Sequence, residues 1–284
     1  MPELPEVETV KRRLNEVIVD KTIGQVEVLR DKSFQGDPHQ ILNQTITQVS
    51  RRAKLLRLEI TGPYDCLVHL KMTGQLIYVG QDERGGGGHP TADWIQQLPG
   101  DHTRVIITFQ DKTKLFFNDM RVFGWIKVAD DEVVKQEFDK YGPDVNQPEF
   151  TTDYLQEKLS NRTIPIKQAI LIGKIVGGVG NIYACEALYQ ARIDPRRPAQ
   201  ELSRSELERL VSALKQVIAK AIKFGGTTFD GKYVDTNGLA GNFQEELKVY
   251  GQEDEPCPNP DCDGKINKIK ISGRGTYFCP SCQN

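Results

Sequence analysis

Four cysteines near the C-terminus have the spacing of a zinc site. Four residues separate the first two, sixteen residues follow, and two residues separate the last two. Four thiolates around one Zn²⁺ would hold a hairpin that has too few apolar residues to fold alone. Two disulfides are the alternative, but a reducing compartment disfavours them. The sequence therefore predicts one structural zinc ion, with no organic cofactor, bound by Cys257, Cys262, Cys279 and Cys282.

The N-terminus, Met1-Pro2-Glu3, has the composition of a covalent catalyst. Methionine before proline is normally removed, which would leave Pro2 as a free secondary amine. With a pKa near 8, about a tenth of this amine is neutral at pH 7 and can attack an electrophilic sugar carbon. The resulting iminium stays positively charged and can draw electrons for an elimination, while Glu3 and Glu6 move protons beside it. The simpler interpretation is that Pro2 only starts a helix.

Further segments have residues that could bind a polyanion. Gly177–Asn181 opens a predicted helix, whose free N–H groups attract phosphate, with Asn181 as the N-cap. Arg274 lies between glycines at the tip of a predicted hairpin. Basic residues also gather at Arg51–Lys54 and over residues 158–185, on a chain of net charge −2. Each cluster alone is typical of a solvated surface, but together they indicate localised phosphate contacts rather than binding by bulk charge.

The elements that must position these residues change along the chain. Apolar residues recur at helical spacing over residues 2–19. Short β-rich runs follow and predict a sandwich or barrel: Thr22–Leu29, Leu55–Ile60, Cys66–Leu70, Gln75–Val79, Val105–Phe109, Lys114–Phe117 and Trp125–Val128. The polar stretch Gly80–His102, which contains Gly85–Gly88, is predicted to be a loop.

A second, helical region is predicted beyond Lys140–Asp153, where glycine and prolines interrupt any periodicity. Helices are expected near 153–160, 165–173 and 182–191, and after a capping box from Ser203 to Glu206. Gly225–Asn242 is predicted to be a loop. We expect an α+β multidomain fold with a catalytic domain over 1–140, a helical domain over 141–250 and a zinc-finger hairpin over 251–284.

The composition excludes several classes of protein. The chain has 284 residues, of which 38% are hydrophobic and 27% charged, as in soluble globular proteins. No apolar run approaches the ~20 residues of a membrane span, and the acidic N-terminus is unlike a secretory signal. We expect a cytoplasmic monomer without membrane contact.

Taken together, these residues resemble the bacterial formamidopyrimidine-DNA glycosylase family, which comprises 8-oxoguanine DNA glycosylases with AP lyase activity. Leu4 favours this branch over the related endonuclease VIII branch, which has glycine there. The matching motifs span nearly the whole chain in family order: Pro2–Thr9, Arg51–Lys54, His69–Gly74, Asp119–Gly124, Gly177–Ala184, Gly225–Thr228, Leu247–Gly251 and the terminal cysteines.

The resemblance implies an N-terminal helix with a β-sandwich, then a helix–two-turn–helix domain with a zinc-finger β-hairpin. It implies a base-excision-repair enzyme that binds double-stranded DNA with oxidised purines or abasic sites, flips out the damaged base and excises it. Pro2 would form the iminium, Glu3 would act as the acid, and Lys54 and Arg274 would assist β- and δ-elimination. The bacterial enzyme would associate with the nucleoid when bound to DNA.

The resemblance also implies a set of DNA-binding residues. Met72, Arg121 and Phe123 would fill the space left by the flipped base, although core packing is the alternative for Met72 and Phe123. Gly225–Asn242 would close over the everted base. The remaining DNA-binding positions are Glu6, His69, His102, Arg162, Asn181, Thr227, Thr228, Tyr250 and Lys268.

Three features depart from the family pattern: the four-residue gap between Cys257 and Cys262, for which we expect a distorted knuckle, the lysine-poor run Ser160–Thr163, and the insertion around Gly85–Gly88. Two other functions stay open. A binding-only zinc-finger protein would show salt-dependent DNA binding without cleavage. A glycosylase for oxidised pyrimidines would prefer thymine glycol to 8-oxoguanine.

Overall fold

A computed structural model describes residues 1–81, 84–88, 98–227 and 242–284. The chain divides into two compact units. The first comprises Met1–Asp139 and Ile222–Gln244, and the second comprises Lys140–Ala221 and Glu245–Asn284. Within the described residues, no helix is long and apolar enough to cross a membrane.

The first unit is a β-sandwich of two five-stranded sheets. All neighbouring strands are antiparallel except β2 and β10, which pair in parallel. One sheet has the order β1 (Ile23–Val28), β8 (Thr103–Phe109), β9 (Lys114–Asp119), β6 (Gly74–Val79), β7 (Arg84–Gly88). The other has the order β2 (Phe34–Gln35), β10 (Trp125–Ala129), β5 (Asp65–His69), β4 (Leu55–Ile60), β3 (Ile46–Arg52).

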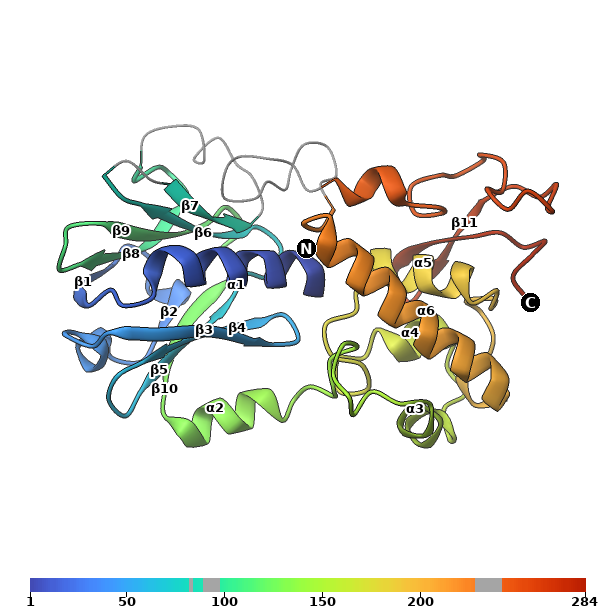
Figure 1. Ribbon diagram of the computed structural model, residues 1–284, viewed down its shortest axis with the longest axis horizontal. Coiled ribbons are helices and arrows are strands. Elements are labelled where there is room, and N and C mark those ends of the chain that lie inside the picture. The colour runs from blue at the N-terminus through green and yellow to red at the C-terminus, as the bar shows by residue number, and fades with distance from the viewer. Residues whose placement is uncertain (82–83, 89–97, 228–241) are drawn as a thin grey trace. The chain divides into compact units, whose positions relative to one another are not determined.

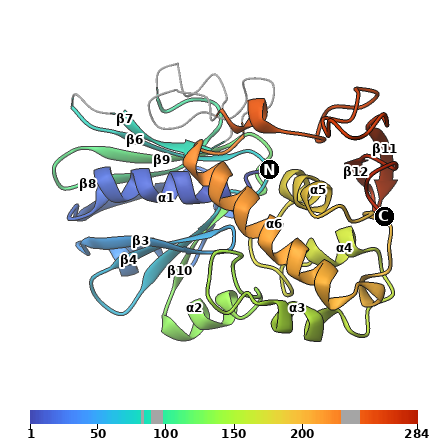
Figure 2. The ribbon, with the colours of Figure 1, turned by 45° about the vertical axis from the view of Figure 1, so that its right-hand side comes forward.

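Helix α1 (Leu4–Ile18) joins the two sheets, because it contacts β6 and β7 of one sheet and β3 and β4 of the other (Figure 1, Figure 2). Its buried Val10 and Leu14 share one hydrophobic core with Val68 and Phe117 from the two sheets. A second helix, α2 (Asp131–Phe138), follows β10. The predicted N-terminal helix and β-sandwich are therefore confirmed.

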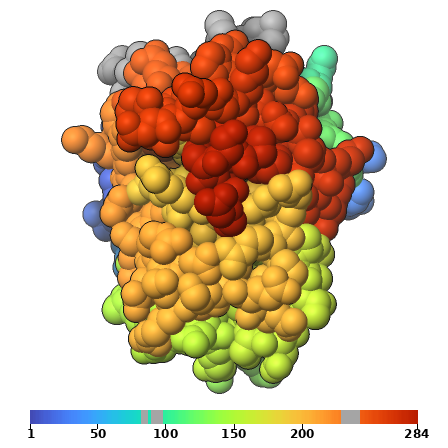
Figure 3. All heavy atoms as spheres, turned by 90° about the vertical axis from the view of Figure 1, so that its right-hand side faces the viewer, coloured from blue at the N-terminus to red at the C-terminus, as the bar shows by residue number. Residues whose placement is uncertain are grey.

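The second unit is built from helices and a hairpin. Ser203 and Glu206 form the predicted capping box of the longest helix, since the backbone N–H of Ser203 donates to the Glu206 carboxylate at 2.7 Å. The C-terminal residues, dark red in Figure 3, lie on the yellow residues around α5. The elements are α3 (Thr152–Leu159), α4 (Ile166–Ile170), α5 (Asn181–Gln190), α6 (Arg204–Lys223, of which Ile222 and Lys223 are assigned to the first unit), β11 (Asn267–Ile271) and β12 (Arg274–Phe278).

The prediction of one loop over Gly80–His102 is wrong for part of that stretch. Residues Arg84–Gly88 form strand β7, which pairs with β6 from Gln75↔Gly88 to Val79↔Arg84. At Gly88 the backbones approach so closely that an added Cβ would lie 2.4 Å from the Gly74 carbonyl oxygen. The glycines thus permit the strand that their composition seemed to exclude.

Candidate active site

The N-terminal amine lies in a partly buried, highly charged environment. Pro2 is buried, whereas the Met1 residue is 52% exposed. Burial lowers the pKa of the N-terminal amine from its usual value of 8.0, and four charged side chains modify this shift. Glu3 and Glu6 raise the pKa, and Lys54 and Arg121 lower it. This pKa is that of the Met1 amine, and removal of Met1 would leave the Pro2 amine beside the same charged side chains.

The Glu6 carboxylate holds two distant segments together. One oxygen accepts the backbone N–H of Glu3 at 2.7 Å, as part of a capping box at the start of α1. The other accepts the backbone N–H of Thr227 at 2.9 Å and its hydroxyl at 3.2 Å. A Cβ on Gly226 would lie 2.7 Å from the same oxygen, so only glycine fits there without displacing Glu6. Thr228 lies outside the described residues.

A second glutamate of α1 supports the turn that carries Lys54. Glu8 accepts a hydrogen bond from Nε of Arg51 at 2.8 Å, and both side chains are less than a tenth exposed. Arg51 also donates to the carbonyl of Ala53, whose φ is +52°. Burial raises the pKa of Glu8, but the charge of Arg51 and the hydrogen bond from Arg12 outweigh it and keep that pKa below its usual value. The ion pair therefore fixes the turn between β3 and β4.

His69 is a neutral hydrogen-bond donor. Its Nδ1 accepts the backbone N–H of Lys71 at 3.0 Å, and its ring lies 5.9 Å from that of Trp125. Burial lowers the pKa of His69 to about 3, and the charges of Lys71 and Lys54 act in the same direction. With Nδ1 accepting, the ring proton lies on Nε2, which can donate to an anion at neutral pH.

Met72 and Phe123 project from two loops of the first unit instead of packing in its core. They are 37% and 48% exposed, and the guanidinium of Arg121 lies 5.0 Å from the Phe123 ring centroid. The loops are held by the fully buried Asp119. Asp119 has no role predicted from the sequence, although it lies in a matching motif.

Asn181 occupies a different position from the predicted one. Gly180 is the N-cap of α5, and Asn181 is the first helical residue. Its amide oxygen accepts from Nζ of Lys167 at 2.6 Å, and its amide nitrogen donates to the carbonyl of Gly275 at 2.9 Å and to the hydroxyl of Tyr250 at 3.3 Å. The N-cap prediction is wrong because the side chain binds the hairpin instead of its own helix.

The hairpin presents Arg274 at its tip. Ser272 and Gly273 form the turn with positive φ, and the Arg274 side chain is exposed. The carbonyl of Gly275 also accepts from Lys167, which is fully buried on α4. Lys268 on β11 pairs with Glu253 at 2.8 Å. The second unit thus brings Asn181, Tyr250 and the Arg274 hairpin into one hydrogen-bonded group.

His102 and Arg162 have ordinary local contacts. The His102 carbonyl accepts the backbone N–H of Asp119 at 2.9 Å, and its side chain is half-buried. Arg162, in the second unit, donates from Nε to the carbonyl of Lys158 at 3.0 Å.

The four C-terminal cysteines have the geometry of a zinc site. Their Sγ atoms all lie within 4.8 Å of one another, and two of the pairs are 3.7 Å apart. Thiolates ~2.3 Å from a tetrahedral Zn²⁺ would be about 3.8 Å apart, so the cluster fits this ion. The long first gap closes through a turn in which the N–H of Cys262 donates to Asn259 at 3.0 Å. The Tyr189 hydroxyl lies 3.5 Å from the sulfur of Cys257.

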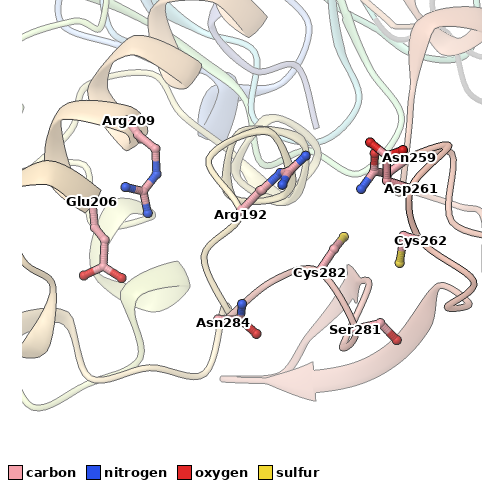
Figure 4. Close-up of a pocket in the computed structure, with 9 residues that line it drawn as sticks. All are labelled: Arg192, Glu206, Arg209, Asn259, Asp261, Cys262, Ser281, Cys282 and Asn284. Carbon is pink, nitrogen blue, oxygen red and sulfur yellow. The ribbon is translucent and has the colours of Figure 1, made fainter.

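A polar pocket of about 440 Å³ borders the cysteine cluster (Figure 4). Cys262 and Cys282 line it together with Arg192, Arg209 and Asp261. These two cysteines are only partly buried, whereas Cys257 and Cys279 are buried. The pocket therefore lies on the side of the cluster formed by its two less buried cysteines.

The fold and the site define a class of zinc-binding protein with a β-sandwich and a helix–two-turn–helix domain. Residues 1–126 match the formamidopyrimidine-DNA glycosylase N-terminal domain, and residues 141–232 match its H2TH domain. Residues 254–284 match the zinc finger found in FPG and IleRS. This match and the cysteine cluster confirm the prediction of one structural zinc ion.

Curated relatives give the same result. A formamidopyrimidine-DNA glycosylase of Lactobacillus delbrueckii subsp. bulgaricus is 38% identical over 100% of this chain and 99% of its own. One from Exiguobacterium is 39% identical with the same coverage. The chain belongs to the formamidopyrimidine-DNA glycosylase family, as the resemblance of its motifs predicted.

Solved structures of this family have the same fold. A Lactococcus lactis FPG variant in complex with Fapy-dG containing DNA has a TM-score of 0.87 at 33% identity, with all of both chains covered. FPG from Thermus thermophilus has a TM-score of 0.84 at 35% identity, over 99% of this chain and 98% of that one. The Lactococcus lactis protein has also been solved with abasic-site DNA.

Proposed function

We propose that this protein is a base-excision-repair DNA glycosylase that removes 8-oxoguanine and formamidopyrimidines from double-stranded DNA and then cuts the strand as an AP lyase. The observation that carries the proposal is the buried Pro2 at an N-terminus whose charged surroundings are Glu3, Glu6, Lys54 and Arg121. The relatives solved with Fapy-dG and abasic-site DNA support the substrate.

The proposed reaction requires removal of Met1, so that the amine belongs to Pro2. The Pro2 nitrogen bonds to C1′ of the flipped nucleotide as the bond between C1′ and the base breaks, and Glu3 supplies a proton that assists ring opening and base release. The nitrogen then loses its proton to the departing base, and its lone pair forms the iminium as the C1′–O4′ bond breaks and O4′ takes a proton from Glu3. Loss of the C2′ proton breaks the C3′–O bond, assisted by Lys54. A second elimination breaks the C5′–O bond, assisted by Arg274.

The remaining residues of the proposal bind DNA. His69, Asn181, Tyr250 and Lys268 contact phosphates, and Met72, Arg121 and Phe123 replace the flipped base. Glu6, Thr227 and Thr228 act at the loop beside the everted base, and His102 and Arg162 contact DNA elsewhere. The domains are 1–140, 141–250 and 251–284. The monomer associates with the nucleoid through this DNA binding.

Borohydride trapping tests the proposal. The probe is a duplex with one 8-oxoguanine opposite cytosine, incubated with protein whose N-terminus is shown by mass spectrometry to be Pro2. We expect a covalent adduct on the Pro2 peptide, and loss of excision with retained DNA binding in Pro2→Gly and Glu3→Gln. Normal excision by both variants would contradict the proposal. DNA binding without a covalent adduct, both on this duplex and on one with thymine glycol, would also contradict it. Preference for thymine glycol would reassign the substrate to oxidised pyrimidines.

A further inference from the structure

The buried carboxylate of Asp119 accepts hydrogen bonds from three backbone N–H groups of a single turn. Asp119 is 0% exposed and lies at the end of β9. Its Oδ2 accepts the backbone N–H groups of Phe123 at 2.8 Å and Gly124 at 2.6 Å. Its Oδ1 accepts the backbone N–H of Arg121 at 3.2 Å and the hydroxyl of Thr73. One side chain thus fixes the backbone on both sides of residue 122.

The residue between these hydrogen bonds has a strained backbone. Val122 has a φ of +55°, in the left-handed region that β-branched residues rarely adopt. Such a conformation persists only where the surrounding contacts impose it. The hydrogen bonds from Arg121 and Phe123 to Asp119 are the contacts on either side of it. Without them the turn would relax, and the side chains of Arg121 and Phe123 would point elsewhere.

Thr73 ties a second loop to the same carboxylate. Its hydroxyl donates to Asp119 and accepts the backbone N–H of Arg121 at 3.0 Å. Thr73 is 4% exposed and directly follows Met72, whose other neighbour, Lys71, also has a positive φ of +51°. The loop with Met72 and the turn with Arg121 and Phe123 are therefore held as one piece, which we call the Asp119–Thr73 clamp.

Exposed apolar side chains lie directly beside this buried polar clamp. Met72, Met120 and Phe123 are 37%, 46% and 48% exposed, against 4% or less for the clamp residues. Large apolar side chains are costly to expose unless they have a partner. Rigid apolar side chains that enter a base stack are the usual means of holding a kinked duplex open.

We propose that Asp119 and Thr73 are positioning residues for base eversion, which deepens the proposed function and rests on it. The clamp residues are buried, so they would act through the exposed side chains that they hold. It holds the side chains that must replace the damaged base while that base leaves the stack. Eversion of an intact lesion should depend strongly on the clamp, because stacking and pairing must be broken. Reaction at an abasic site should depend on it less, because no base has to leave.

The test compares single-turnover rates on two duplexes, one with 8-oxoguanine opposite cytosine and one with a preformed abasic site. Thr73→Val removes the hydroxyl at nearly constant volume, Thr73→Ser keeps it, and Asp119→Asn removes the charge. We expect Thr73→Val and Asp119→Asn to slow 8-oxoguanine excision about 10- to 100-fold, because a substitution far from the reacting atoms can misplace the groups that act on them. Cleavage at the abasic site should change less than about 3-fold, and Thr73→Ser should behave as the unchanged protein.

Asp65→Asn is the matched control for a general loss of stability. Asp65 is 6% exposed in the same unit, and its carboxylate accepts the N–H of Ile60 at 3.0 Å and Nε of Arg57 at 2.6 Å. It should not separate the two substrates. Equal slowing of both substrates by the clamp variants, or no slowing on 8-oxoguanine, would overturn the inference.

A binding readout separates this inference from the proposed function. A 2-aminopurine beside the lesion becomes brighter when the stack opens, whether or not excision follows. We expect the unchanged protein to raise this fluorescence and Thr73→Val to raise it several-fold less at saturating protein. A chain that opens the stack without excising the base would contradict the proposed glycosylase but not the clamp. Equal brightening by both proteins would contradict the clamp.

Discussion

Buried acidic residues of this protein act mainly as hydrogen-bond acceptors that fix other segments. Glu6 joins the start of α1 to Thr227, and Glu186 on α5 accepts the backbone N–H groups of Lys248, Val249 and Tyr250. Burial raises the pKa of Glu186, and the three backbone hydrogen bonds oppose that shift. Hydrogen bonds to a charged acceptor each contribute about 1.5–3 kcal/mol, enough to hold an irregular segment in one conformation.

His69 makes the stability of the first unit depend on pH. Its pKa is lowered to about 3 in the folded chain, against an ordinary value of 6.5. The unfolded chain therefore binds more protons between these values, and stability falls as the pH falls from about 6.5 toward 3. Well below pH 6.5 the loss approaches about 1.4 kcal/mol per pH unit.

We expect His69→Asn to lose this component, because asparagine keeps an acceptor for the Lys71 N–H but does not titrate. Urea unfolding from pH 7 to pH 4.5 would show a shallower decline in the free energy of unfolding than in the unchanged protein. All other ionisable groups are the same in both proteins, so their contributions to the pH dependence cancel in the comparison. His39→Asn, at an exposed histidine, should keep the original slope. Parallel pH profiles for His69→Asn and the unchanged protein would contradict the prediction.

At the scale of elements, hydrophobic patterning identified the strands with alternating or continuous apolar residues but missed others. Strand β7 was predicted as loop because glycines carry no pattern, and it forms only through pairing with β6. Strand β3 and helix α2 were missed as well. The spacing that predicts helices succeeded for α1 and α6, since each buries one regular face.

In the candidate site too, some features could be predicted from local sequence patterns and others could not. The zinc ligands and the exposed loops could be found from motifs, because their residues lie close together in the sequence. The contact between Glu6 and Thr227 and the hydrogen bonds from Asn181 to the hairpin join residues 221 and 94 positions apart. No local pattern encodes such pairs. Asp119 was missed because a buried aspartate at a strand end is indistinguishable in sequence from an exposed turn residue.

The close approach of β6 and β7 predicts a large effect of one methyl group. Gly88 has a φ of +142°, and a Cβ there would lie 2.4 Å from a backbone oxygen and 2.7 Å from the Cα of Gln75. We expect Gly88→Ala to destabilise the protein by about 3 kcal/mol or more, because backbone must move. Thermal unfolding would measure the loss.

Gly62→Ala is the matched control in the same unit. Gly62 also has a positive φ, of +89°, but its Cβ would meet only the end of the flexible Gln44 side chain. The cost should be limited to the backbone conformation, about 1–2 kcal/mol. If both variants lost the same stability, steric overlap at β7 would have no measurable role.

At the scale of the whole molecule, charge must be localised for this chain to bind DNA. It carries 37 basic and 39 acidic side chains, so its overall field does not attract a polyanion. Binding by the proposed interface then rests on a few cations together with neutral donors such as Tyr250 and the neutral His69. Only the cations release counterions from DNA. The proposed cationic contacts are Lys54, Arg121, Arg162, Lys268 and Arg274.

The salt dependence of DNA binding tests whether contacts by cations and contacts by neutral donors can be distinguished. With a few phosphate contacts by cations, the slope of log K against log salt should be about −3 to −5 on an abasic-analogue duplex. Lys268→Gln should weaken binding at low salt and make the slope shallower by about one. Tyr250→Phe removes a neutral donor in the same unit and should weaken binding without changing the slope. Equal slope changes in both variants would contradict the assignment of Lys268 as a cationic contact and Tyr250 as a neutral donor. A slope steeper than about −8 for the unchanged protein would also contradict the prediction, because binding would then involve many more cations than these five.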